Sequence, residues 1–158
     1  MDSASFLRHT LATLAYRATR ALHRAPEDFA GFRAGPGSRT AGEILAHMGD
    51  LCDWAASFVV GEPVWREQPP GAWEADKDRF FLGLTRLDQS LRQSAATLPE
   101  DTAQRLFQGP IADALNHVGQ LALLRGLAGA PVKGENYFVA DIVAGRTTPL
   151  QPSPKRTF

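Results

Sequence analysis

Apolar residues recur every three to five positions along most of this chain, and no stretch keeps the strict alternation of a half-buried strand. The first apolar stripe predicts an amphipathic helix from about Ser5 to Leu22. Ser3 or Ser5 is expected to cap its start, because a serine side chain accepts a hydrogen bond from the first free backbone N–H groups. Pro26 prevents the helix from continuing, since proline lacks the N–H that a helix interior needs.

A second helix is predicted after a loop rich in glycine and proline at residues 31–38. Thr40 and Glu43 have the spacing of a capping box, in which each residue satisfies a free N–H of the other at a helix start. Gly61 and Pro63 are expected to end this helix.

Two more stripes predict a third and a fourth helix. The third begins near Trp73 and is expected to reach Pro99. The fourth is expected to begin at Pro110, because proline is favoured at the first helical position, and to stop at Gly129 and Pro131.

The remaining residues, 130–158, predict a short packed segment with one helical turn near Asp141, followed by an extended, proline-containing tail. Four amphipathic helices of this length can cover one another's apolar faces. The expected fold is therefore all-α: a four-helix bundle in a single domain over residues 1–158, with core helices at about 4–129 and a short C-terminal extension.

Composition narrows the possible partners. The 158 residues include 17 Lys plus Arg and 17 Asp plus Glu, so the net charge is zero. That balance argues against nucleic acid and against an anionic membrane surface, because both attract basic proteins. We also expect no transmembrane helix and no signal peptide. A lone cysteine, Cys52, excludes an intrachain disulfide and is compatible with a cytoplasmic location.

Three residues have the chemistry and spacing of a metal site. Asp113 and His117 lie one turn apart on the fourth predicted helix, hence on one face, and His47 lies beside the apolar stripe of the second. Three protein ligands would leave positions open for water or substrate. The ordinary alternatives are a packed histidine and a surface ion pair. His9 and His23 stand next to arginines and are expected to be solvated.

Three further residues are candidates to support these ligands, because a metal-bound histidine usually donates its second N–H to a carboxylate or carbonyl. Glu43 and Asp50 lie one turn before and after His47, and Gln120 lies one turn after His117. The capping box is the favoured role for Glu43, and a solvated amide is the alternative for Gln120.

The segments at residues 38–54 and 116–129 resemble the second and fourth helices of the DinB-like superfamily, and residues 131–138 are similar to tails in one branch of it. This resemblance implies a metal-binding four-helix bundle. It implies ligands at His47, at His117 and at the position of Asp113, where the family usually has histidine. Zinc or nickel is the expected ion, with iron and manganese as further candidates.

The resemblance also implies function. Relatives include transferases that use low-molecular-weight thiols, and some relatives are regarded as metal-dependent hydrolases, so a small-molecule substrate and a homodimer are expected. The alternative is a non-enzymatic, ligand-binding or dimerising stress-response bundle whose metal site is weak or vestigial. An iron oxygenase, compatible with two histidines and one carboxylate, is disfavoured because such sites are usually built on β-barrels.

Overall fold

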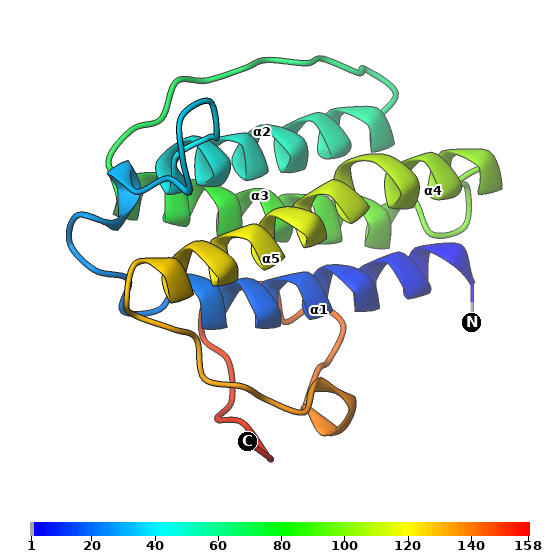
Figure 1. The fold of residues 1–158 in the computed structure, drawn as a ribbon. Helices are drawn as coiled ribbons and strands as arrows, with labels where there is room; N and C mark the ends of the chain where they lie inside the picture. The colour runs from blue at the N-terminus through cyan, green and yellow to red at the C-terminus, as the bar shows by residue number, and fades with distance from the viewer. Residues whose placement is uncertain (1) are drawn as a thin grey trace.

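The computed structural model describes residues 2–158, and helices are its only regular elements apart from one isolated β-bridge between Glu135 and Thr157 in this part of the chain (Figure 1). The all-α prediction is confirmed. The helices are α1 (Ser3–Leu22), α2 (Ala41–Val59), α3 (Trp73–Gln93), α4 (Glu100–Leu106) and α5 (Ala112–Leu127). The shorter elements are the 3₁₀ turns η1 (Phe29–Gly31) and η3 (Tyr137–Val139) and the π-helical segment η2 (Phe107–Ile111).

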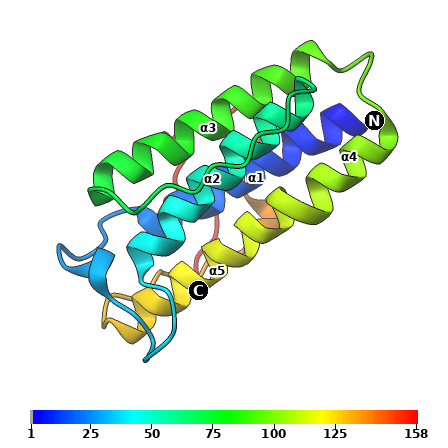
Figure 2. The same cartoon turned by 90° about the horizontal axis from the view of Figure 1, so that it is seen from above.

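Because α4, η2 and α5 follow one another without a break, the molecule has four long helical rods. Both α1 and α2 pack against α3 and α5, which places α1 and α2 at opposite corners of the bundle (Figures 1 and 2). Residues 60–72 run back along α2, so that α2 and α3 point in the same direction. α5 runs antiparallel to α2. In the described residues, no helix is both long and apolar enough to cross a bilayer.

One apolar core joins all four rods, and its largest fully buried members include Phe29, Phe80, Leu45 and Met48. The rods approach most closely between α2 and α3. A Cβ at Gly83 would lie 2.8 Å from the Cβ of Cys52, so any larger residue would force the two helices apart. Cys52 is itself buried there.

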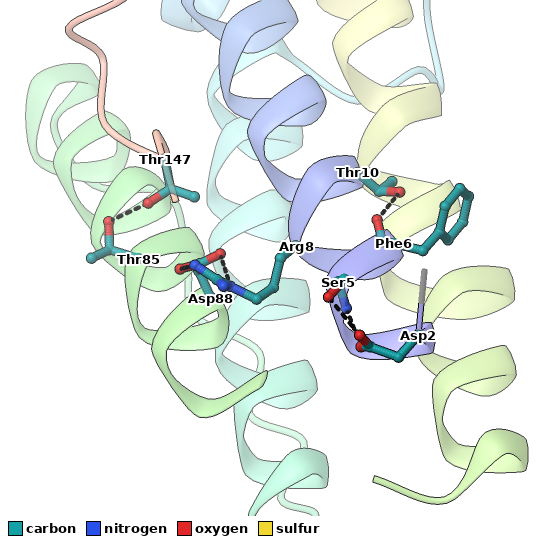
Figure 3. Close-up of polar contacts among 8 residues, drawn as sticks. All are labelled: Asp2, Ser5, Phe6, Arg8, Thr10, Thr85, Asp88 and Thr147. Atoms are coloured by element: carbon teal, nitrogen blue, oxygen red, sulfur yellow. Dashed lines mark hydrogen bonds and ion pairs between the residues drawn. The ribbon is translucent and has the colours of Figure 1, made fainter. Parts of the chain in front are cut away.

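The predicted start of the second helix is confirmed. For the first helix, the predicted capping residue is wrong. Thr40 and Glu43 form the complete capping box at the start of α2. At the start of α1, neither Ser3 nor Ser5 is the cap. Asp2 takes that role, because its carboxylate accepts hydrogen bonds from the backbone N–H and the hydroxyl of Ser5 (Figure 3).

The predicted end of the third helix and the predicted start of the fourth are wrong. α3 stops at Gln93, and a turn leads to Pro99, which precedes a helix already begun at Glu100. Pro110 therefore lies inside a helix. The π-helical widening of η2 accommodates a residue that cannot donate the regular hydrogen bond. The end near Gly129 is confirmed: α5 stops at Leu127, and Gly129 has the left-handed φ of 77° that favours glycine.

The C-terminal segment packs on the opposite side of the bundle from the 60–72 connection (Figure 1). Its helical turn is η3, at residues 137–139, rather than near residue 141. Buried Glu135 accepts hydrogen bonds from Tyr16 and Arg20 of α1. Further along, Thr147 contacts Thr85 of α3 at 3.0 Å (Figure 3).

α1 and α3 are also joined directly. Arg8 donates two hydrogen bonds to the Asp88 carboxylate, at 2.9 and 3.1 Å, from one rod to the other (Figure 3). This two-pronged geometry is among the stronger forms of charged contact. Several polar contacts thus hold the face of the bundle that lies away from the candidate site.

Candidate metal centre

The structure brings His47, Asp113 and His117 together where α2 packs against α5. One donor atom from each residue lies within 4.8 Å of the other two. The Nε2 atoms of His47 and His117 each lie 3.4 Å from a different oxygen of the Asp113 carboxylate. The carboxylate therefore stands between the two imidazoles, whose ring centres are 5.1 Å apart.

The orientation of His117 is set by Gln120, one turn further along α5. The Gln120 Oε1 lies 2.7 Å from the His117 Nδ1, so that Nδ1 carries the proton and donates it. Nε2 then presents a lone pair towards Asp113. This buried nitrogen has no hydrogen-bond partner among the described residues. The contact between Gln120 and His117 is therefore present, and its support of a bound metal stays a prediction.

Such an arrangement is electrostatically incomplete without a positive charge. A neutral imidazole lone pair and a carboxylate oxygen repel each other, and an unpaired buried polar atom typically costs about 1–3 kcal/mol. A cation between them would bind the imidazole lone pair and the carboxylate oxygen together and remove the repulsion. Two ligands at about 2.1 Å from a tetrahedral ion lie roughly 3.4 Å apart, the same as the two carboxylate–imidazole distances. The residues present therefore fit a divalent metal.

The three candidate ligands differ in exposure, and this defines the open side of the site. The side chains of His117 and His47 are 8% and 17% exposed, whereas that of Asp113 is 45% exposed. Asp113 also lies well inside the continuous helix formed by residues 100–127. The positive end of a helix dipole therefore does not explain why an acidic residue stands at this position.

Trp65, from the connection between α2 and α3, covers one edge of the site. Its ring lies 5.8 Å from that of His47 and packs edge-on against Trp54, also at 5.8 Å. The connection is tied to α2 by two hydrogen bonds, in which Val64 and Gln68 donate their backbone N–H groups to Ser57 and Asp50. The indole of Trp65 is thereby held beside the imidazole of His47.

Neither carboxylate proposed to support His47 does so. Glu43 is engaged in the capping box, and the N–H of Thr40 holds the pKa of its carboxyl below the usual value. Asp50 is buried and accepts a 2.6 Å hydrogen bond from Arg79 of α3. Partial burial works against the charge of Arg79, but its hydrogen bonds to Asp50 and Asp53 outweigh that effect and raise its pKa.

Sequence reasoning missed two features next to the site. A cavity of about 470 Å³ lies between α2 and the 60–72 connection, and His47 lines it together with Glu67, an exposed carboxylate. The Arg79–Asp50 pair was missed as well. Neither could be inferred from periodicity, because both depend on the path of residues 60–72 and on the direction of α3.

Thiol chemistry by the chain's own cysteine is blocked. Cys52 is buried between α2 and α3, and burial strongly raises the pKa of its thiol. Because the thiolate is the nucleophile and the metal ligand, this cysteine is inert in the folded protein.

A scan against protein-family models, a search of curated proteins and a search of solved structures each found no match to this chain. The DinB-like resemblance therefore rests on the chain's own residues. The structure supplies the helical bundle and the group of three potential ligands.

Proposed function

We propose that this protein binds one divalent metal ion through His47, Asp113 and His117 and uses it to activate a small molecule. Two imidazoles and a carboxylate are borderline-to-hard donors that suit zinc or nickel best, and iron or manganese as well. Three protein ligands leave at least one coordination position for water or substrate. The half-exposed side of Asp113 is where a substrate would approach.

One observation carries the proposal: among residues 2–158, the buried Nε2 of His117 has no hydrogen-bond partner and faces a carboxylate, while Gln120 fixes the opposite nitrogen. A histidine kept for packing would be expected to use both nitrogens or to face a donor. This arrangement instead resembles the way in which metal ligands are oriented by a second residue.

The DinB-like resemblance leads us to propose an S-transferase that uses a low-molecular-weight thiol, or else a hydrolase. When bound, the metal would act as a Lewis acid that lowers the pKa of a coordinated thiol or water. Since Cys52 is inaccessible, the thiol must come from a small molecule. Within the chain, Gln120 orients His117, Trp65 packs beside His47, and Glu67 is an exposed carboxylate that lines the neighbouring cavity.

A non-enzymatic bundle is the second candidate. It is favoured by one residue, Asp113, which stands where the resembled family usually has histidine. A stress-response role, a cytoplasmic location and a homodimer remain predictions of the sequence.

Titration calorimetry of tag-free protein with zinc and with nickel tests the proposal. We expect one ion per chain and loss of binding in His117→Ala. His9→Ala is the matched control, because His9 is exposed on α1, away from the site. Affinity should fall on acidification, since the ligands must be deprotonated. Equal affinity in both variants would place the metal elsewhere, and binding of no zinc, nickel, iron or manganese would leave the non-enzymatic bundle.

A further inference from the structure

An apolar pocket of about 240 Å³ lies between α2 and the α4–η2 part of the facing rod. Trp54, Ala55 and Phe58 line it from α2, and Leu106 and Pro110 line it from the opposite rod. Part of its wall is η2, the π-helical segment at residues 107–111. Such widened turns recur at functional sites.

Helix geometry places this pocket next to the metal ligands. Trp54 follows His47 by seven residues, or two turns on the same face of α2, which corresponds to about 10 Å. On the antiparallel rod, Gly109 precedes Asp113 by four residues. Trp65 bridges the two parts, because its ring packs against both His47 and Trp54.

The size and chemistry of the pocket limit what fits it. A dry apolar cavity of roughly 150 Å³ accommodates benzene, so about 240 Å³ is sufficient for a ring with a short alkyl chain. Arg105 also lines the pocket. Its guanidinium has no ion pair or hydrogen bond with any residue in the described part of the chain, which leaves one cation available to an anionic ligand.

We infer that this pocket is a binding subsite for an arylalkyl carboxylate, with the ring between Trp54 and Pro110 and the carboxylate at Arg105. If the proposed function holds, on which the role in catalysis rests, the subsite holds the apolar part of the substrate while its reacting group reaches the metal about two helical turns away. The site as a whole then selects elongated substrates with an apolar end.

The test uses nuclear magnetic resonance of ¹⁵N-labelled, metal-free protein with 4-phenylbutyrate as the probe. The three tryptophans give three indole N–H signals. We expect the Trp54 signal to shift on titration, and that of Trp65 to a smaller extent. The Trp73 signal should stay in place, because its ring packs on Phe29 rather than beside the pocket. Removing the metal prevents the probe carboxylate from binding an ion.

Two glycines provide a matched pair of variants. Gly109 lines the pocket, and a Cβ there meets no atom within 4 Å, so Gly109→Leu should fill the open space without a clash. Gly126→Leu adds the same side chain at an equally open position on α5, away from the pocket. Both changes favour a helix. We expect Gly109→Leu to abolish the Trp54 shift and Gly126→Leu to preserve it.

The neutral analogue 4-phenylbutan-1-ol tests the role of Arg105. Arg105→Gln should weaken 4-phenylbutyrate roughly two- to fivefold, the range for an exposed ion pair, and leave the alcohol unchanged. Absence of a Trp54 shift, or normal binding in Gly109→Leu, would overturn the subsite even if zinc binds. Conversely, 4-phenylbutyrate binding at Trp54 in a protein that binds no metal would retain the subsite and reject the proposed function.

Discussion

Gln120 offers the sharpest separation between a metal-binding and a merely structural His117. Its amide oxygen lies 2.7 Å from His117 Nδ1, and the residue itself is exposed on α5. Gln120→Leu removes the acceptor while nearly preserving the volume of the side chain. Because the position lies outside the core, the variant should fold normally. The histidine is then free to rotate or to move its proton to the nitrogen that must bind the ion.

The expected loss follows from what such supporting residues contribute. Removing a residue that orients a metal-bound histidine typically weakens binding about 10- to 100-fold, which corresponds to roughly 1.4–2.8 kcal/mol. Calorimetry with zinc measures the affinity directly. In saturating zinc, the same free energy should lower the melting temperature of the variant by about 3–11 °C relative to wild type, at roughly 2–4 °C per kcal/mol for a domain of this size.

Gln120→Glu is the matched control. It keeps an acceptor at the same reach, so zinc affinity should equal or exceed that of wild type. The rise in melting temperature on adding zinc is compared within each variant, because removal of the Gln120 acceptor leaves His117 Nδ1 unpaired and also destabilises the metal-free protein. Unchanged zinc affinity in Gln120→Leu, together with loss of binding in His117→Ala, would refute the orienting role.

Further predictions concern the same site and the rest of the bundle. Asp113→His should keep or tighten zinc binding, and Asp113→Ala should weaken it. If calorimetry finds the same zinc affinity in Asp113→Ala and in wild type, Asp113 is not a ligand. Glu135→Ala should lower the free energy of unfolding in urea by about 3–5 kcal/mol, because it leaves the buried Tyr16 hydroxyl and Arg20 without their partner; a loss below 1 kcal/mol would contradict this. Burial, assisted by Glu135, raises the pKa of Tyr16. The protonated Tyr16 therefore contributes its full stabilisation below about pH 10, and this stabilisation is lost as pH rises through the folded-state pKa. Because Phe cannot ionise, the free energy of unfolding of Tyr16→Phe should decrease less at alkaline pH than that of wild type. Finally, Cys52 should react with a thiol reagent at pH 8 only after unfolding, and rapid labelling of the folded protein would show that it is accessible.

The sequence predicts those features of the structure that depend only on residues close together in the chain. The capping box of Thr40 and Glu43 needs only four residues, so it could be identified before any packing was known. The pairing of Asp113 with His117 follows from the pitch of a single helix. That His47 would join them required the family resemblance, because periodicity alone does not say which helix faces which.

The errors arose where tertiary packing overrides a local signal. Pro110 has the sequence signature of a helix start, but η2 widens by part of a turn and the helix passes through it. Leu98 extends the apolar stripe of α3 from a turn rather than from the helix, since it packs against the core after α3 has ended. Asp50 was predicted to support His47, but it accepts a hydrogen bond from Arg79, which is 29 residues away in the sequence.

The path of residues 60–72 has a consequence for how fast this chain folds. In a bundle whose helices alternate in direction, each helix can form a hairpin with the next and gain contacts after closing a short loop. Here α1 and α2 lie at diagonal corners and do not form a hairpin. The next pair, α2 and α3, are parallel neighbours, and residues 60–72 must run the length of the bundle to connect them. Antiparallel partners such as α2 and α5 are separated by the whole of α3 in sequence. Since folding rates decrease as contacts become less local, we expect refolding to be slower than for an up-and-down bundle of equal length and stability.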